Sequence, residues 1–278
     1  PTVMATAIVE GHPYTPAIGR MLSRVDPASG VHLLCVEPKR FSFDGVTGHN
    51  YGRVIYELGT GPVADEAYYQ RGAANREAAA LLKPGDFDFE SLCAQGVRWL
   101  HSGGIFACIG AQTYELIIHG MQCVRQAGGY TSFDLNVRTK LARELLRREP
   151  REVFAQIMPQ VSLLFGNEED LQTGLGIEGP AVGEKGAQFT KDDFLRMAFE
   201  VVGRYPNIQA VVSSVRLVKR REVHLWGAYM LYDRQLYVVE PEEITVVDRV
   251  GGGDACGGTL VAALMGGADP DMALKLGV

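Results

Sequence analysis

Several features that define whole classes of protein are missing from this sequence. No apolar run approaches the length of a membrane span. The first residues do not show a signal peptide, in which a charged stretch precedes an apolar one, so we expect a cytoplasmic protein. The formal net charge is −6, which argues against a nucleic-acid backbone as partner but leaves a small anionic substrate possible.

Paired cysteines are also missing. The five cysteines include no Cys-x-x-Cys pair, and each lies in or beside an apolar stretch: Cys35, Cys93, Cys108, Cys123 and Cys256. An odd number without such spacing predicts buried free thiols in a reducing compartment, and indicates neither disulfides nor a zinc site.

The composition is that of an ordinary globular protein. The 278 residues are 46% apolar and 22% charged, which suits one large α/β domain with a small appendage. Two β-rich runs, residues 52–59 and 66–72, flank a Gly/Pro segment and predict an antiparallel ribbon.

From about residue 73 apolar strands alternate with amphipathic helices, which predicts a doubly wound, mostly parallel sheet flanked by helices. Helices are expected around residues 113–127, 139–149, 190–205 and 255–265. Residues 224–240 predict a hairpin that turns at Asp233-Arg234. Five polar clusters, "HSGG", "DLNVR", "GNEED", "SSVR" and "DRVGGGD", each follow a strand. Because ligands bind at the carboxyl ends of parallel strands, we expect the site there.

The glycines at 251–253 stand directly before Asp254 and a small-residue helix. A helix start offers unpaired N–H groups to an anion, and glycine lets a phosphate approach the backbone. A plain tight turn is the simpler alternative. The segment matches neither the P-loop nor the dinucleotide fingerprint. A carboxylate beside bound phosphate suggests a base that accepts a proton from an attacking alcohol.

These motifs resemble a known family. "DRVGGGDACGG", "LLFGNEEDLQTGLGI", "SFDLNVR", "RWLHSGGIF" and "LLKPGDFD" resemble the ribokinase-like (PfkB) carbohydrate kinases, and most of all the branch that phosphorylates 2-keto-3-deoxygluconate. The resemblance implies phosphoryl transfer from ATP to a sugar hydroxyl, with Mg²⁺ and K⁺ as cofactors. It also implies a nine-stranded sheet, a small β-lid formed by residues of about 45–72, and a homodimer or higher oligomer assembled through that lid.

The resemblance also implies roles for individual residues. Asp254 would be the catalytic base. The anion hole would be made by Gly251, Gly252 and Gly253, with the amide of Asp254. The sugar acid would contact Tyr69, Arg71 and Arg138, besides Asp254. The nucleotide would contact Gly253, Asn167, Ser213, Ser214 and Arg216. Magnesium would be organised indirectly by Asn167 and Asp170, and a monovalent cation by the loop of Asp248. Asp134 and Asn136 alternate with Arg138, so all three side chains are expected on one side of the strand end.

The sequence departs from the family in two places. The family's first signature, G-G-x-x-x-N, is absent, and the family continues beyond the point that corresponds to Val278. We therefore expect that residues 1–278 form one kinase domain that is incomplete at both ends. Two alternatives stay open: another sugar or nucleoside kinase of this fold (fructokinase- or ribokinase-like), or a non-catalytic sugar-binding or regulatory homologue. His101, His119 and His224 are expected to be core or surface histidines, and Trp99 and Trp226 core residues.

Overall fold

The computed structural model describes residues 80, 82–180, 189–220, 223–246 and 251–278, together with four short strands between residues 22 and 48. Those four strands form two antiparallel pairs, β1 with β2 and β3 with β4: Leu22–Val25, His32–Cys35, Phe41–Phe43 and Val46–Gly48. The ribbon predicted at 52–72, and with it most of the β-lid, lies outside the described residues.

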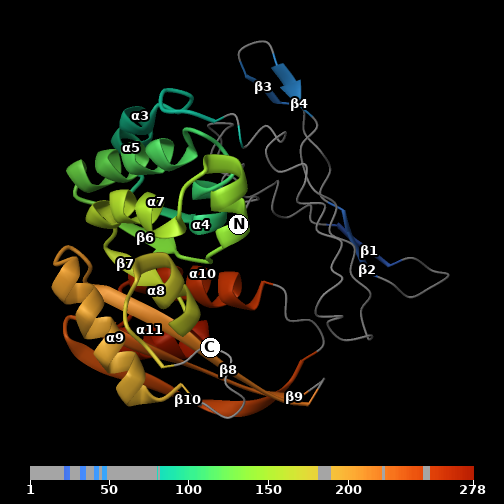
Figure 1. Ribbon diagram of the computed structural model, residues 1–278, viewed down its shortest axis with the longest axis vertical. Coiled ribbons are helices and arrows are strands. Elements are labelled where there is room, and N and C mark those ends of the chain that lie inside the picture. Colours follow the sequence, from blue (N-terminus) through green and yellow to red (C-terminus); the bar gives the residue numbers. More distant parts are fainter. Residues whose placement is uncertain are drawn as a thin grey trace.

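The described part of the chain contains a six-stranded sheet in the order β10-β9-β8-β7-β6-β5, of which Figure 1 labels β6 to β10. Its strands are β5 Trp99–Gly103, β6 Tyr130–Asp134, β7 Leu163–Phe165, β8 Ala210–Arg220, β9 Val223–Tyr232 and β10 Gln235–Thr245. The pairings among β5, β6, β7 and β8 are parallel, and β9 is antiparallel to both of its neighbours. The expected doubly wound, mostly parallel sheet is confirmed, with six strands in the described part where the family resemblance implied nine.

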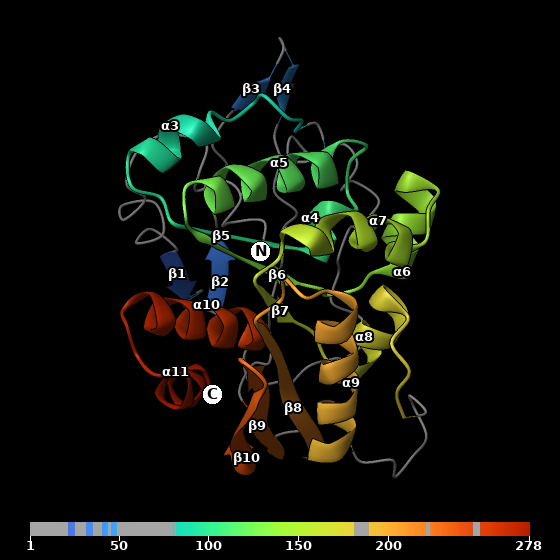
Figure 2. The same ribbon diagram turned by 90° about the vertical axis from the view of Figure 1, so that its left-hand side faces the viewer.

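Helices cover both faces of the sheet. They are α3 Phe89–Ala94, α4 Gly104–Ala107, α5 Thr113–Gln126, α6 Thr139–Leu141, α7 Pro150–Ile157, α8 Glu168–Leu175, α9 Lys191–Arg204, α10 Gly252–Met265 and α11 Pro270–Gly277, with the π-helix η3 Ala142–Leu146 and the 3₁₀-helix η4 Met158–Gln160. Figure 2 shows β8, β9 and β10 between α10 and α11 on one side and α8 and α9 on the other. None of the described helices is long and apolar enough to cross a membrane.

Alternate strand residues enter two separate cores. Val211 of β8 packs in the larger core, which includes buried residues of α5, α7 and α9, whereas Val212 packs with Leu260 of α10 and Leu274 of α11. The period of two along a strand directs successive side chains to opposite faces. Because both faces are apolar, β7 and the first residues of β8 are buried on both sides, as parallel strands require.

Local sequence signals explain most element boundaries. Thr190 and Asp193 form the predicted capping box at the start of α9, with Asp193 N donating to Thr190 Oγ1 at 3.1 Å. The β9–β10 turn uses Asp233 and Arg234 with φ of 47° and 65°, the left-handed conformation that a two-residue hairpin turn requires. Four of the cysteines are buried free thiols, as expected: Cys93, Cys108, Cys123 and Cys256.

The single helix expected over 139–149 is wrong. The segment forms the short helix α6 and then the π-helix η3, and Arg147 ends it with a φ of 54°. A new helix, α7, then begins at Pro150, where the missing N–H of proline costs nothing.

Candidate active site at the carboxyl edge of the sheet

The carboxyl ends of the parallel strands lie in one row. Gly103 of β5 is in register with Asp134 of β6, Asp134 with Phe165 of β7, and Phe165 with Val212 of β8. Paired residues of parallel strands direct their side chains to the same face. Because Phe165 and Val212 pack in the core beneath α10, the side of Asp134 faces α10 as well.

Glycine brings the first two strand ends close together. A Cβ at Gly104, the first residue of α4, would lie 1.9 Å from the carbonyl oxygen of Leu135 and 2.6 Å from the ring of Phe154. A side chain at this position would displace the backbone after β6. Gly104 therefore holds the loop of residues 134–138 against the end of β5.

Helix α10 begins at this edge with a glycine run and no side-chain cap among the described residues. Its N-cap, Gly251, has a φ of 81°, a left-handed conformation that suits glycine. The first backbone hydrogen bond runs from Ala255 N to Gly251 O at 2.7 Å. The N–H groups of Gly252, Gly253 and Asp254 precede it and have no partner within the helix. By contrast, side chains cap α8, α9 and α11.

Packing does not explain the second and third glycines. A Cβ at Gly252 would meet only the ring of Trp226, at the ordinary contact distance of 3.7 Å. Apart from the adjacent residues and the backbone of α10 itself, no described atom lies within 4 Å of a Cβ built on Gly253. The described residues leave room for side chains here, so the bare backbone leaves three N–H donors at the positive end of a helix uncovered by them.

Asp254 is exposed in the first turn of α10, and its charge reaches two groups on the sheet. Burial lowers the pKa of His101 to about 4, and the charge of Asp254 opposes that shift. The Nδ1 atom of His101 lies 2.8 Å from the hydroxyl of Ser132, and its ring meets Phe165 edge to face. His101, expected to be an ordinary core or surface histidine, is therefore a neutral imidazole beside the candidate base.

Asp134 is the most perturbed carboxyl group of the site. Burial, followed by the charges of Asp170 and Asp254, raises its pKa to about 7. A backbone N–H of Asn136 and the charge of Arg138 lower this pKa, but by less. Three carboxylates thus approach one another with one arginine among them, which concentrates negative charge in front of the strand ends.

Asn167 and Asp170 form a capping box at the start of α8. Asp170 N donates to Asn167 Oδ1 at 2.8 Å, and Asn167 N donates to Asp170 Oδ2 at 3.3 Å. The other carboxylate oxygen of Asp170 accepts from Val137 N at 2.8 Å. Burial raises the pKa of Asp170, whereas these hydrogen bonds lower it. Asp170 therefore joins α8 to the loop after β6.

Arg138 lies near Asp134, as predicted, and near Asp170, although the chain between Asp134 and Arg138 is a loop and not an extended strand. Strand β6 ends at Asp134, and Asn136 has a φ of 30°, so the expected alternation of 134, 136 and 138 along one strand is wrong. The loop nevertheless brings the charge of Arg138 within reach of Asp134 and Asp170, whose pKa values it lowers. Its Nη1 donates to Val137 O at 2.8 Å.

Strand β8 separates the three residues expected at the nucleotide. Ser213 lies on the same face of the strand as Val211. It is fully buried, and its hydroxyl has no hydrogen-bond partner among the described residues. Ser214 and Arg216 lie on the opposite face, which α10 covers. Ser214 is half-buried and Arg216 is exposed, so these two are open to a ligand.

Three expected site residues, Tyr69, Arg71 and Asp248, lie outside the described part of the chain. Sequence reasoning gave no role to His101 and predicted that Trp226 lies in the core. In the structure the ring of Trp226 lies against Gly252 at the start of α10, and His101 is within electrostatic reach of Asp254. The signal that could have indicated a role for His101 was its position in the polar strand end "HSGG".

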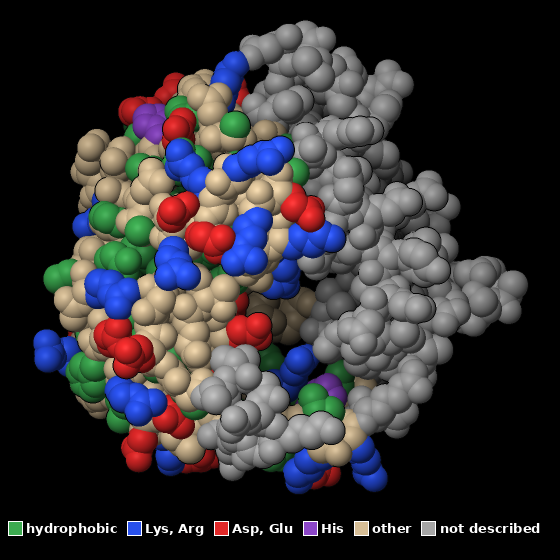
Figure 3. All heavy atoms as spheres, in the orientation of Figure 1, with side chains coloured by type: hydrophobic (Ala, Val, Ile, Leu, Met, Phe, Trp, Pro, Cys, Tyr) green, Lys and Arg blue, Asp and Glu red, His purple; other side chains and the backbone are tan. Residues whose placement is uncertain are grey.

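Lys and Arg side chains are interspersed with Asp and Glu side chains over the described surface that Figure 3 shows.

Comparison with known proteins finds carbohydrate kinases that are similar to this chain. No family model matches the chain. The 2-dehydro-3-deoxygalactonokinase of Haloferax volcanii is 25% identical over 226 residues, 81% of this chain and 62% of that protein. A solved 2-dehydro-3-deoxygluconokinase from Thermotoga maritima matches with 26% identity and a TM-score of 0.62, over 72% of this chain and 57% of that one. A PfkB family carbohydrate kinase from Listeria grayi matches with 25% identity and a TM-score of 0.58, over 71% of this chain and 57% of that one.

The chain thus spans less than two thirds of each of these proteins. In sequence and in fold, this chain is similar to carbohydrate kinases, one of which is named as a member of the PfkB family.

Proposed function

We propose that the protein transfers a phosphoryl group from ATP to a hydroxyl of a sugar acid. The observation that carries the proposal is the uncapped start of α10, which combines three N–H donors, a Gly253 that no described side chain covers, and Asp254 on the same turn. Phosphoryl transfer needs an oriented nucleophile and neutralised charge, and this turn offers both.

Each residue of the turn has a part in the reaction. Asp254 accepts the proton of the attacking hydroxyl, and because it is exposed it can reach a bound substrate. The N–H groups of Gly252, Gly253 and Asp254 bind the oxygens of the transferred group, where negative charge is held in the transition state. Burial lowers the pKa of His101 to about 4, so its imidazole is neutral at neutral pH and brings no positive charge to the site.

The acidic cluster fits a hard divalent cation. Burial, followed by repulsion from Asp170 and Asp254, raises the pKa of Asp134, and a bound cation would relieve that repulsion. Carboxylate and amide oxygens suit Mg²⁺, which keeps several of its waters. Both oxygens of Asp170 already accept backbone hydrogen bonds, so Asp170 and Asn167 would hold Mg²⁺ through water. When bound with ATP, Mg²⁺ neutralises charge on the phosphate oxygens.

The substrate we propose is 2-keto-3-deoxygluconate, with phosphorylation at its terminal hydroxyl. Arg138 supports a substrate carboxylate, because a guanidinium binds two carboxylate oxygens at once. The Thermotoga and Haloferax proteins are named for the gluconate and galactonate forms of one acid. These forms share the carboxylate, so Arg138 does not distinguish them.

Replacing Asp254 by asparagine tests the proposal. We expect Asp254→Asn to fold and bind ATP but to lose about 10²–10⁴-fold in turnover, the usual share of a general base. Asp271→Asn is a matched control, since it removes an acidic residue from the first turn of α11, away from the strand ends. Turnover would be measured with ATP and a panel of sugar acids and neutral sugars.

The outcomes separate the parts of the proposal. If Asp254→Asn keeps more than about a tenth of wild-type turnover, Asp254 is not the base. A wild type that prefers a neutral sugar contradicts the sugar acid and leaves the kinase in place. A folded wild type that consumes no ATP with any sugar contradicts the kinase itself.

A further inference from the structure

A second cluster of chemically reactive side chains lies between α3 and α5, on helices that the kinase site does not use. Phe89 and Cys93 of α3 pack with Leu116 and Val124 of α5 in a small apolar core of their own. Gly120 permits the close packing, because a Cβ there would lie 2.7 Å from the ring of Phe89. The two helices are therefore held at a fixed distance by apolar contacts.

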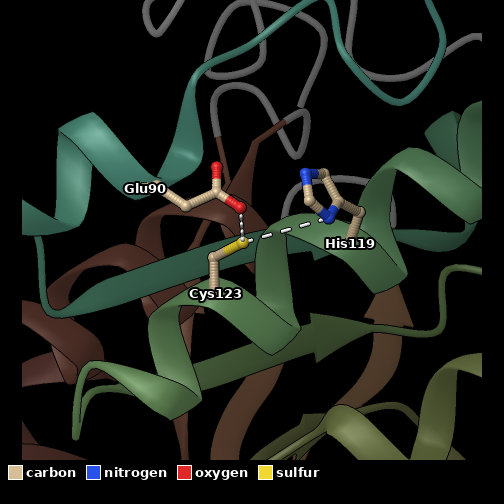
Figure 4. Close-up of side chains that lie close together, drawn as sticks. All are labelled: Glu90, His119 and Cys123. Carbon is tan, nitrogen blue, oxygen red and sulfur yellow. Dashed lines mark hydrogen bonds between the residues drawn. The ribbon is translucent and has the colours of Figure 1, made fainter.

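This packing brings together a carboxylate, an imidazole and a thiol (Figure 4). His119 and Cys123 are four residues apart on α5, so they share one side of the helix. Glu90 approaches them from α3. Cys123 Sγ lies 3.3 Å from Glu90 Oε1 and 3.9 Å from His119 Nδ1, and the three ligand atoms all lie within 4.8 Å of one another.

We propose that Glu90, His119 and Cys123 bind a zinc ion that clamps α3 to α5. Sulfur, nitrogen and oxygen donors are the ligand types that Zn²⁺ accepts, usually in tetrahedral geometry. A thiolate and an imidazole favour zinc over the Mg²⁺ of the kinase reaction, which prefers oxygen. Cysteine spacing in the sequence did not indicate a zinc site, because only one of the three ligands is a cysteine and Glu90 comes from another helix.

The geometry needs little adjustment to hold the ion. Zinc bonds of about 2.3 Å to sulfur and about 2.0–2.1 Å to nitrogen and oxygen place a tetrahedral sulfur roughly 3.5–3.6 Å from either of the other two ligand atoms. The sulfur–oxygen separation of 3.3 Å must therefore lengthen, and the sulfur–nitrogen separation of 3.9 Å must shorten, each by a few tenths of an ångström. Glu90 is exposed and His119 half-buried, so rotation of these side chains can supply the change.

The burial pattern suits a bound ion with an open position. Cys123 is buried, 7% exposed, which places the sulfur on the inner side of the cluster. Because Glu90 is exposed, a water molecule can complete the tetrahedron from the outside. The ring of Phe89 meets His119 edge to face at 5.6 Å and holds the imidazole toward the sulfur.

The site is tested with Co²⁺, which takes the place of zinc and absorbs light when a thiolate binds it. The reduced chain is titrated with Co²⁺, and the thiolate-to-cobalt charge-transfer absorption is recorded. We expect one Co²⁺ per chain, displaced by one Zn²⁺ and not by a large excess of Mg²⁺. Zinc should also raise the melting temperature, since an ion that binds only the folded state stabilises it.

Matched variants decide whether these three residues hold the ion. Cys123→Ser should abolish the absorption, whereas Cys93→Ser, which alters the neighbouring buried thiol of the same core, should keep it. Glu90→Gln removes a ligand at the surface and leaves the core intact, so it keeps the test valid if Cys123→Ser unfolds. It should weaken zinc binding at least about tenfold, the lower limit for supporting residues of metal sites. Glu144→Gln, an exposed carboxylate on η3, should change nothing.

Two results overturn the proposal. If the wild type shows no stoichiometric thiolate absorption, the cluster is a thiol that donates a hydrogen bond to Glu90 and nothing more. If Glu90→Gln binds zinc as tightly as the wild type, zinc is held by other groups. Neither result depends on kinase activity.

Discussion

Replacing Asp134 by asparagine should make the protein more stable at neutral and alkaline pH. The asparagine would keep the size of the side chain, and its oxygen could still accept the hydrogen bond from Asn136 N. The variant would remove the negative charge that burial and the charges of Asp170 and Asp254 make unfavourable. The free energy of unfolding should therefore be higher for the variant than for the wild type wherever Asp134 is ionised.

The structure sets an upper limit for the effect. The pKa of Asp134 rises from 3.8 to about 7 on folding, roughly three units. At 1.36 kcal/mol for each unit, ionised Asp134 lowers the free energy of unfolding by at most about 4 kcal/mol. Asp170 and Asp254 share the titration, so the measured value should be smaller.

The sign follows from the direction of the shift. The folded protein holds the proton of Asp134 more tightly than the unfolded chain does. The favourable contribution is therefore complete below about pH 4 and is lost as the pH rises through about 7. Urea unfolding of wild type and Asp134→Asn, compared from about pH 5 to pH 8, should show a stability difference that grows with pH in favour of the variant.

Asp193→Asn provides a control of opposite sign. Hydrogen bonds from Thr190 lower the pKa of Asp193, so its stabilising contribution exists at neutral pH and is lost as the pH falls. Asp193→Asn should therefore be less stable than the wild type, and the deficit should shrink in acid. A stability difference for Asp134→Asn that stays constant from about pH 5 to pH 8 would refute the reasoning about Asp134.

Three further substitutions probe the site. Gly253→Ala should leave the protein folded and raise the free energy of unfolding by about 0.5–1 kcal/mol, since alanine favours a helix. Phosphoryl transfer should nevertheless collapse, because the methyl group occupies the space in front of the N–H groups. An unchanged kcat would contradict the anion hole. Gly251→Ala should lose about 1–2 kcal/mol in urea unfolding, because φ is 81°, and an equally stable variant would mean that the turn relaxes freely. Arg138→Ala should lower kcat/KM for a sugar acid by about one to two powers of ten and change kcat/KM for a neutral sugar far less. Equal losses for both sugars would mean that Arg138 does not bind the substrate carboxylate.

Much of the fold followed from local patterns in the sequence. The strands of the sheet, the hairpin at Asp233-Arg234 and the capping box of Thr190 each depend on residues close together in the chain. The helix over 139–149 failed because Lys, Leu, Ala, Arg and Glu favour every helical form. A π-turn differs from an α-turn only in its hydrogen-bond partners, which residue type does not reveal.

The motifs of the site could be predicted from the sequence, but the contacts between residues far apart in the sequence could not. Asp254 and the glycines were marked by their order along the chain. The approach of Asp254 to His101 joins residues more than 150 positions apart, and no spacing rule shows it. Likewise, "SSVR" marks a strand end, but only the packing of α10 and α9 on opposite faces decides that Ser214 is open and Ser213 is buried.

The hydrogen bonds of Asp170 have a consequence for how two ligands influence each other. One carboxylate holds both the start of α8, proposed for the nucleotide side, and Val137 in the loop that carries Arg138, proposed for the sugar side. A ligand that moves one of these segments therefore changes the free energy of the other. Such coupling is reciprocal at equilibrium: by whatever factor the nucleotide tightens binding of the sugar acid, the sugar acid must tighten binding of the nucleotide.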